Sequence, residues 1–256
     1  MSSWYMAPDI SAEQFIAEHT FLYVVKGTVN IFDGNKHHKF LPGECGVGRK
    51  NHLARYSKEK INDELEKVFV FFDEAFLKGY QQKHKSVVNK FKSPGAIVRV
   101  EENKLVPIYI SSLLPYYSKG VIDAAFADVK REELLIILLR QRPELAGVFF
   151  DFGIPEKMDI ESFMNRNYKF NITVERLAYL TGRSLSAFKR DFSQVFNDTP
   201  THWLVQRRLK EAYFLLEKKN KKPAEIYLDL GFENLSHFSY AFKKRFGVPP
   251  KDVLRG

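Results

Sequence analysis

The chain has 256 residues, of which 45% are apolar and 28% charged, and this makeup is that of an ordinary soluble protein rather than a disordered one. Lys and Arg number 40 and Asp and Glu 31, for a formal net charge of +9. Cys45 is the only cysteine, so the sequence excludes an internal disulfide and a zinc site built on cysteines. Because residues 1–10 show no signal-peptide pattern, we expect the protein to work in the reducing cytoplasm.

Short strands separated by turns are predicted for the first part of the chain. The run FLYVVKGTVNIF ends at Asp33-Gly34, a pair typical of tight hairpins, and Pro42-Gly43 indicates a second turn. The run KVFVFFDEAF then predicts a further apolar strand. Several short strands punctuated in this way predict an antiparallel β-barrel or double sheet.

Residues 107–150 change to a helical pattern. In the segment VKREELLIILLRQRPEL, a block of six apolar residues from Leu134 to Leu139 lies between charged shoulders. The block is far too short to span a bilayer, which needs about 20 apolar residues, so we expect no membrane insertion. A helix that is apolar almost all round is buried, and two interpretations stay open: it is core within the domain, or it forms a dimer interface.

A domain boundary is expected near residue 155, where Gly153 and Pro155 interrupt the helical pattern. It divides the chain into residues 1–154 and residues 155–256. The second part holds 19 Lys and Arg against 12 Asp and Glu, a net charge of +7, whereas the first has a net charge of +2. A positive domain gains affinity for nucleic acid by neutralising phosphates and releasing counterions.

The second domain contains an internal repeat, residues 184–200 and 234–250. Six positions are identical in the two copies: Leu185, Ser186, Phe188, Phe192, Phe196 and Pro200 match Leu235, Ser236, Phe238, Phe242, Phe246 and Pro250. The phenylalanines recur at every fourth residue, which puts them on one buried stripe of a helix. With the apolar segment and glycine that precede it, each copy predicts a helix-turn-helix motif, at about residues 173–196 and 223–246.

The face opposite each phenylalanine stripe carries hydrogen-bond donors suited to phosphates and base edges. Asn197 and Gly247 follow the two helices at matching positions, and both residue types accept the left-handed conformation of a helix end. Between the copies, a linker helix is predicted from the N-cap Thr199 to Pro223, which opens the next helix. About 20 residues form a rod of about 30 Å, near the ~34 Å repeat of B-DNA, so the two motifs can enter successive turns of the major groove.

The motif GF-x5-F-x3-F-x3-FG-x-P, which begins at Gly231, resembles the DNA-binding domain of AraC/XylS-type transcriptional regulators, as do the segments LAYLTGRSLSAFKRDFSQVF and QRRLKEAYFLL. The resemblance covers about the last 100 residues and departs from the family at Asn197, where glycine is usual. It implies a regulator of transcription, more often an activator, that docks the second helix of each motif on double-stranded DNA and presents a surface to RNA polymerase. Carried over by position, the DNA-binding residues that it implies are Ser186, Lys189, Arg190, Ser193, Ser236, His237, Ser239, Tyr240, Lys243 and Lys244.

The first domain is similar to the cupin-type regulatory domain that precedes the DNA-binding domain in many members of this family. The fold class expected for the whole chain is therefore α+β: a cupin-like antiparallel β-barrel or double sheet with flanking helices, followed by an all-α domain of two helix-turn-helix motifs joined by a linker helix. The resemblance favours a homodimer. The further role of the first domain stays open between sensing a small-molecule effector and capture by a protein antagonist.

A metal-dependent cupin enzyme fused to a DNA-binding domain is the alternative. Such metal sites need a His-x-His pair, an acidic residue and a later His, all aimed at one ion. His37 and His38 are adjacent, so on a strand they point to opposite faces, and Glu44 and His52 follow without completing the set. We therefore expect no metal, no cofactor and no enzymatic activity, with His37 and His38 facing solvent on a hairpin.

Overall fold

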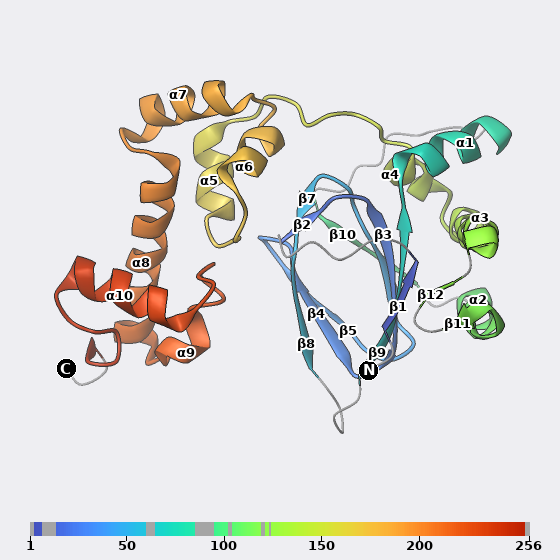
Figure 1. Cartoon of the computed structure of the whole chain (residues 1–256), viewed down its shortest axis with the longest axis horizontal. Coiled ribbons are helices and arrows are strands. Elements are labelled where there is room, and N and C mark those ends of the chain that lie inside the picture. Colours follow the sequence, from blue (N-terminus) through green and yellow to red (C-terminus); the bar gives the residue numbers. More distant parts are fainter. Residues whose placement is uncertain are drawn as a thin grey trace. The chain divides into compact units, whose positions relative to one another are not determined.

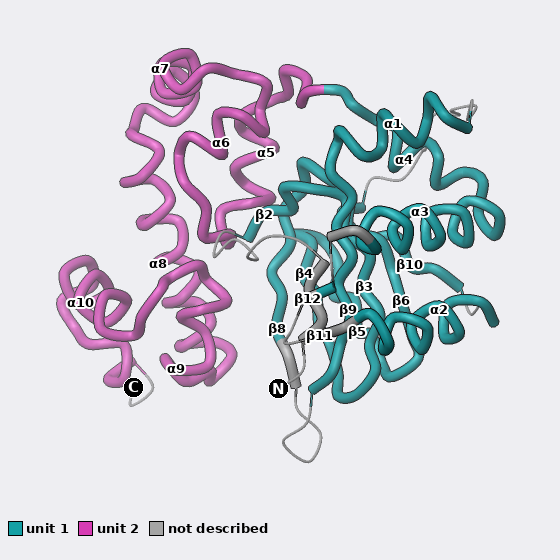
Figure 2. Tube along the Cα trace, turned by 45° about the vertical axis from the view of Figure 1, so that its right-hand side comes forward, with its two compact units in different colours: residues 1–153 teal, residues 154–256 magenta. Residues whose placement is uncertain are grey.

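Two compact units make up the chain in the computed structural model, Met1–Gly153 and Ile154–Gly256 (Figure 2). The structure describes residues 3–6, 14–59, 65–84, 95–101, 104–118, 121–122 and 124–253. The first unit combines β-sheets with helices, whereas the elements described in the second are all helices. The predicted fold class, α+β with an all-α second part, is confirmed.

A seven-stranded sheet is the largest sheet of the first unit (Figure 1). Its strands are, in spatial order, β10 (Ile97–Val100), β6 (Cys45–Gly48), β3 (His19–Lys26), β9 (Glu66–Phe72), β1 (Ser3–Met6), β12 (Val121–Ile122) and β11 (Tyr117–Ser118). Strand β1 is parallel to β9 and β12, and the other pairs described in this sheet are antiparallel. A three-stranded antiparallel sheet holds β5 (His37–Phe40), β4 (Thr28–Phe32) and β8 (Arg55–Glu59), and β2 (Phe15–Ile16) pairs with β7 (His52–Leu53).

Turn residues separate strands that join different sheets. Gly27, at a φ of +80°, divides the run FLYVVKGTVNIF into β3 and β4, which pair in different sheets. The predicted hairpin follows β4, where the Asp33 carboxylate accepts hydrogen bonds from the backbone N–H groups of Asn35 and Lys36, at 3.0 and 2.7 Å. The second predicted turn contains Gly43, at a φ of +89°, and leads into β6. Both predicted turns are confirmed.

Successive residues of β9 point to two different apolar cores. Val68, Val70 and Phe72 belong to a core shared with the helices, whereas Phe69 lies in a core shared with the three-stranded sheet. The helical elements are α1 (Glu74–His84), α2 (Leu105–Leu113), η1 (Leu114–Tyr116), α3 (Ala124–Gln141), η2 (Pro143–Leu145) and α4 (Ala146–Phe149). Figure 1 shows α2 and α3 on the side of the large sheet away from β4, β5 and β8. The large sheet is therefore covered on both faces.

Helix α3 contains the predicted apolar block. Leu134, Leu135 and Leu138 are fully buried in the core of the first unit. The other three residues of the block are partly buried and pack against that core. The three fully buried leucines are thus core within their own unit, and the three partly buried residues contribute to that core as well. In the part of the chain that the structure describes, no helix is both long and apolar enough to cross a bilayer.

Three of the four residues considered as metal ligands have other polar partners. His37 is exposed, whereas His38 is half-buried and its Nε2 lies 2.8 Å from Asp33 Oδ2. Glu44 forms an ion pair, and His52 Nδ1 lies 2.8 Å from a backbone carbonyl. The expectation that both histidines face solvent is therefore wrong for His38, because the Asp33 carboxylate in the hairpin turn holds its ring. Within the described ranges, no group of three or more His, Cys, Asp or Glu is arranged to hold a metal ion.

The second unit is built around one long helix. Its described helices are α5 (Ile160–Asn167), α6 (Val174–Leu180), α7 (Leu185–Phe196), α8 (Pro200–Lys219), α9 (Pro223–Ile226) and α10 (Leu235–Phe246). Two apolar cores lie along α8: the first packs α5, α6 and α7 around Leu204, and the second packs α9 and α10 around Leu209, Ala212 and Leu216. With 20 residues, α8 is a rod of about 30 Å that passes from one core to the other.

Candidate nucleic-acid interface

Short polar side chains start the helices of the first motif. The Thr173 hydroxyl accepts a hydrogen bond from the N–H of Arg176 at 3.2 Å and begins α6. The Ser184 hydroxyl accepts one from the N–H of Ala187 at 3.3 Å and begins α7. Asn197 ends α7 in the left-handed conformation, at a φ of +50°, as predicted. The bounds of α7 are thus set by residues next to it in the sequence.

The second motif repeats this arrangement with a shorter leading helix. Helix α9 has only four residues, and a turn through Gly231, at a φ of +81°, leads toward α10. The Asn234 side chain accepts a hydrogen bond from the N–H of His237 at 2.7 Å and begins α10, and Gly247 ends it at a φ of +79°. The second helices of the two motifs therefore have matching ends and the same length, 12 residues.

The phenylalanine stripes have nearly the same geometry in both copies. The ring centroids of Phe188 and Phe192 lie 5.7 Å apart, as do those of Phe238 and Phe242, and all four side chains are 0% exposed. The next ring along each helix follows at 4.5 Å in α7 and 4.6 Å in α10. The interpretation of the stripes as core is confirmed, so the opposite faces of α7 and α10 point outward.

The ten predicted DNA-binding residues lie on these two helices, four on α7 and six on α10. Nine of them are exposed: Ser186, Lys189, Arg190, Ser193, Ser236, His237, Tyr240, Lys243 and Lys244. Ser239 is half-buried. Each helix thus presents its own group of donors, an arrangement suited to a duplex, and contact of these residues with DNA stays a prediction.

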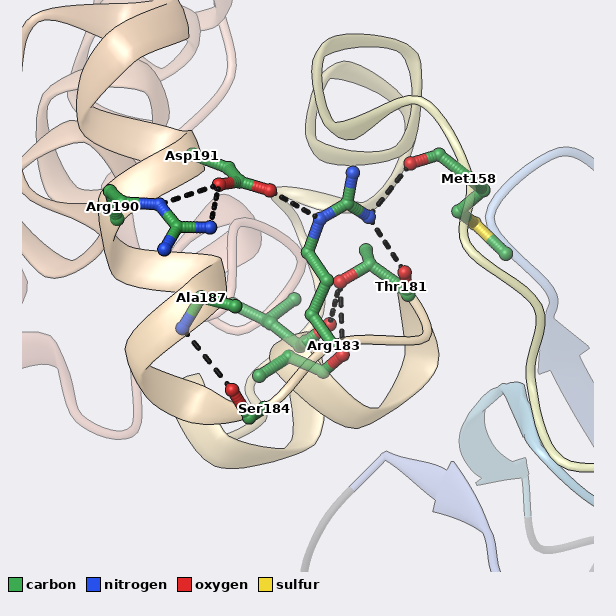
Figure 3. A network of polar contacts seen from close by, with 9 residues as sticks. Met158, Thr181, Arg183, Ser184, Ala187, Arg190 and Asp191 are labelled. Carbon is green, nitrogen blue, oxygen red and sulfur yellow. Dashed lines mark hydrogen bonds and ion pairs between the residues drawn. The ribbon is translucent and has the colours of Figure 1, made fainter.

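An ion-pair network links Arg190 to Arg183 through the carboxylate of Asp191 (Figure 3). Its Nε and Nη2 donate hydrogen bonds to Asp191 Oδ1, at 3.2 and 3.0 Å. Asp191 Oδ2 accepts one from Arg183 Nε at 3.1 Å, and Arg183 Nη1 also donates to the carbonyl oxygens of Met158 and Thr181, at 2.8 and 2.7 Å. The hydrogen bonds from Arg183 and Arg190 hold the pKa of Asp191 below its usual range.

The two arginines in this network differ in burial. The Arg183 side chain is 9% exposed and joins the turn before α7 to the segment before α5, so its role is structural. The Arg190 side chain is 69% exposed, and an exposed ion pair adds little to stability. Arg190 can therefore leave Asp191 for a ligand at small cost, while Asp191 keeps its bond to Arg183.

The outward faces of α7 and α10 carry their charge at different places. Lys189 and Arg190 lie in the middle of α7, whereas the basic residues of α10 are in its last turn, Lys243, Lys244 and Arg245. Cations in a last turn also interact favourably with the helix C-terminus. The first motif is thus better supplied with cations for base edges, and the second with cations for phosphates.

Three residues with structural hydrogen bonds in this unit were not predicted from the sequence: Arg183, Asp191 and the buried Arg208 of α8. Arg208 occupies the apolar stripe of α8, four residues from both Leu204 and Ala212. A charged residue at a position where the apolar stripe of a helix continues is the sequence pattern that could have identified Arg208. No sequence pattern identifies Arg183, because two of its hydrogen bonds go to backbone carbonyls, which every residue carries.

Two protein-family descriptions match the chain. The ExsA N-terminal regulatory domain matches residues 19–148, just over half of the chain. A helix-turn-helix domain matches residues 177–256, which contain most of both motifs. The matches fall on the β-rich unit and on the helical unit, respectively.

Several curated proteins are similar in sequence. The HTH-type transcriptional regulator ExsA of Pseudomonas aeruginosa is 22% identical over 244 residues, which cover 91% of this chain and 84% of that protein. The virulence regulon transcriptional activator VirF of Yersinia enterocolitica is 23% identical over 179 residues, 65% of this chain and 66% of VirF. The uncharacterized HTH-type transcriptional regulator YdiP of Escherichia coli is 33% identical over 97 residues. That match covers 38% of this chain, which spans only about a third (32%) of YdiP.

Solved structures match the chain over nearly all of its length or over about the length of the helical unit. An apo ToxT variant from Vibrio cholerae is 13% identical, with a TM-score of 0.45, over 95% of this chain and 90% of its own. A probable AraC family transcriptional regulator from Rhodopseudomonas palustris is 28% identical, with a TM-score of 0.33, over 38% of this chain and 91% of its own. Because the regulatory-domain match spans more than half of the chain and the helix-turn-helix match follows it, the chain belongs to the AraC/XylS-type family of transcriptional regulators, among those with the ExsA N-terminal regulatory domain.

Proposed function

We propose that the chain binds specific sites on double-stranded DNA by placing α7 and α10 in successive turns of the major groove, and that it activates transcription from there. The observation that carries the proposal is the repetition: two helices of 12 residues, with the same ring packing behind them, present exposed donors on their outward faces. The α8 rod of about 30 Å is close to the ~34 Å between groove turns. Because this family consists of transcriptional regulators, the cupin-enzyme alternative is set aside.

The contacts divide into base readers and phosphate contacts. Arg190 is the strongest reader, because a guanidinium can donate two hydrogen bonds to one guanine and its ion pair with Asp191 is exposed. Lys189 lies beside it, and the remaining readers are Ser186 on α7 and Ser236, His237, Ser239 and Tyr240 on α10. The phosphate contacts are Ser193, Lys243 and Lys244.

Activation follows from position in this proposal. The protein binds upstream of a promoter and presents a surface to RNA polymerase. The positive sign is supported by the name of a relative, the virulence regulon transcriptional activator VirF. The description of the first unit as a regulatory domain supports a signal received there, from a small-molecule effector or from a protein antagonist.

We also propose that the first unit joins two copies of the chain. Large apolar side chains are exposed on α2, η1 and the first turns of α3: Leu105, Ile108, Leu114, Tyr116, Phe126 and Val129. The rings of Tyr116 and Phe126 lie 4.6 Å apart, so η1 and α3 meet in this group. Exposed apolar side chains that gather in one place mark interaction surfaces, and a two-fold dimer pairs the same surface on both copies. A dimer would bring four recognition helices to paired sites on DNA.

Binding titrations on a specific and a scrambled duplex test the proposal. Lys189→Ala and Arg190→Ala should each lose about 1–3 kcal/mol of binding free energy on the specific duplex and less on the scrambled one, because base contacts carry the sequence information. The matched control is Lys39→Ala, which removes an exposed lysine from β5 of the first unit and should bind like the wild type. Equal losses on both duplexes would assign the two residues to phosphates instead. Unchanged isotherms for both would contradict the proposal.

A further inference from the structure

A buried arginine lies where the two halves of the helical unit meet. Arg208, in the middle of α8, is 8% exposed. Its guanidinium donates three hydrogen bonds to backbone carbonyls: Nε to Tyr168 at 2.7 Å, Nη2 to Phe170 at 2.8 Å and Nη1 to Gly231 at 2.9 Å. Burial lowers the pKa of this guanidinium to about 10, and no carboxylate of a described residue forms an ion pair with it.

The three carbonyls come from both halves of the helical unit. Tyr168 and Phe170 follow α5, which packs in the first core, and Gly231 lies in the turn that precedes α10. A Cβ at Gly231 would lie 2.9 Å from Arg208 Cζ and 2.8 Å from the carbonyl oxygen of Lys169. The turn of the second motif therefore lies directly against the loop between α5 and α6, and the guanidinium fills the junction between them.

The other polar contacts at this junction lie at its rim. Asn171 Nδ2 donates a hydrogen bond to Glu233 Oε1 at 3.2 Å, in an exposed position. Lys169 pairs with Glu211 of α8 at 3.3 Å. The Asn171–Glu233 pair is exposed and contributes little to stability, and the Lys169–Glu211 pair is only partly buried. Among these contacts, only those of Arg208 join both halves from a buried position.

Burial of a cation without an ion-pair partner costs desolvation free energy. An arginine at a buried junction is therefore expected where its hydrogen-bond geometry does what an apolar side chain cannot. A guanidinium is planar and rigid, so its three bonds fix direction as well as distance, whereas a lysine ammonium is a point charge on a flexible stem. We propose that Arg208 is a positioning residue that sets the separation and rotation of α7 relative to α10. It thereby sets the spacing between the two half-sites that the protein accepts on DNA. The inference rests on the proposed function, in which both helices dock on one duplex.

A spacing series with the full chain tests this inference. The duplexes carry the two footprinted half-sites at their natural separation, or with one or two base pairs inserted. Each insertion moves one half-site by about 3.4 Å along the duplex and about 35° around it. The wild type should lose about tenfold or more in affinity on the first insertion, the size of a mismatch in a specific site. Arg208→Lys, which keeps the charge, should lose less than about threefold and should bind an isolated half-site like the wild type.

The matched control is Arg207→Lys, the same change one residue earlier on α8. The Arg207 guanidinium lies over the Tyr168 ring at 4.3 Å and pairs with Glu211, but it donates to none of the three carbonyls. This variant should keep the wild-type dependence on spacing. An equally steep dependence in Arg208→Lys would overturn the role of Arg208. A wild type that is indifferent to spacing would instead contradict the docking of two helices on one duplex.

A distance measurement between spin labels tests the same inference without DNA. The labels are attached at Gln194→Cys on α7 and Lys244→Cys on α10, both exposed, in a Cys45→Ser background. The distance distribution should be narrow with Arg208 present and broader in Arg208→Lys, and equal widths would overturn the inference. If circular dichroism shows that Arg208→Lys does not fold, Arg208→Gln replaces it in both assays with the same expected results, because its amide carries no buried charge and cannot donate to all three carbonyls.

Discussion

Truncation of one ring in each phenylalanine stripe tests whether the two motifs have equivalent cores. Phe192 and Phe242 occupy the same place in the repeat and are both 0% exposed. Each contacts a ring on either side along its helix, at 5.7 Å in one direction and at 4.5 or 4.6 Å in the other. Phe→Ala at a fully buried site costs about 3–5 kcal/mol, because the lost burial adds to the cost of the cavity left behind. A domain unfolds with a free energy of about 5–15 kcal/mol, so each variant should lose a large part of it.

Urea unfolding followed by circular dichroism measures this loss. With a slope of about 1–1.5 kcal/mol per M, Phe192→Ala and Phe242→Ala should each lower the midpoint by about 2–5 M. Phe214→Ala is the control, since this side chain of α8 is 48% exposed, and it should lose less than about 1 kcal/mol. A loss below about 1 kcal/mol at either buried ring, or a loss at only one of the two, would refute the reasoning.

Other variants test a phosphate contact, two turns and the thiol. Lys243→Ala should weaken binding to all duplexes alike and flatten the slope of log affinity against log salt by about one in anisotropy titrations, and an unchanged slope would remove Lys243 from the phosphate contacts. In thermal melts, Gly182→Ala should destabilise more than Gly247→Ala. Both residues have positive φ, but a Cβ at Gly182 would lie 2.6 Å from backbone atoms, whereas nothing lies within 4 Å at Gly247. Equal losses of stability in the two variants would show that the backbone next to Gly182 moves to make room for the added methyl. Burial raises the pKa of Cys45 to about 12, so the folded protein should resist alkylation at neutral pH, and rapid labelling would contradict the burial. Because the raised pKa belongs to the folded state, this thiol stabilises the fold below about pH 9, and that contribution should be lost as the pH rises from there toward about 12.

The helical unit could be predicted from the sequence because its patterns are local. The four-residue period of Phe188 and Phe192 defines the buried face of α7 within two turns of the helix. Asn197 and Gly247, which end α7 and α10, follow them directly in the chain. The exposed faces then follow from the buried ones, and nine of the ten residues expected on them are exposed.

Contacts between helices and strands that lie far apart in the sequence could not be predicted in the same way. The bonds of Arg208 join residues 23 to 40 positions apart, so they depend on how the helices pack. In the first unit, the predicted turns did not determine which sheet each strand joins, because β6 pairs with β3 and β10 over long separations. His38 was expected to face solvent, because the alternation of side chains along a strand does not predict a contact with the Asp33 carboxylate in the preceding turn.

Hydroxyl-radical footprinting of the full chain on its specific duplex tests the central claim most directly. If α7 and α10 enter successive turns of the major groove, each bound protomer should protect two patches about 10 base pairs apart on one face of the duplex. Protection should then weaken in the α7 patch alone when Lys189 is changed to alanine. One patch per protomer, or two patches on opposite faces of the duplex, would contradict the account.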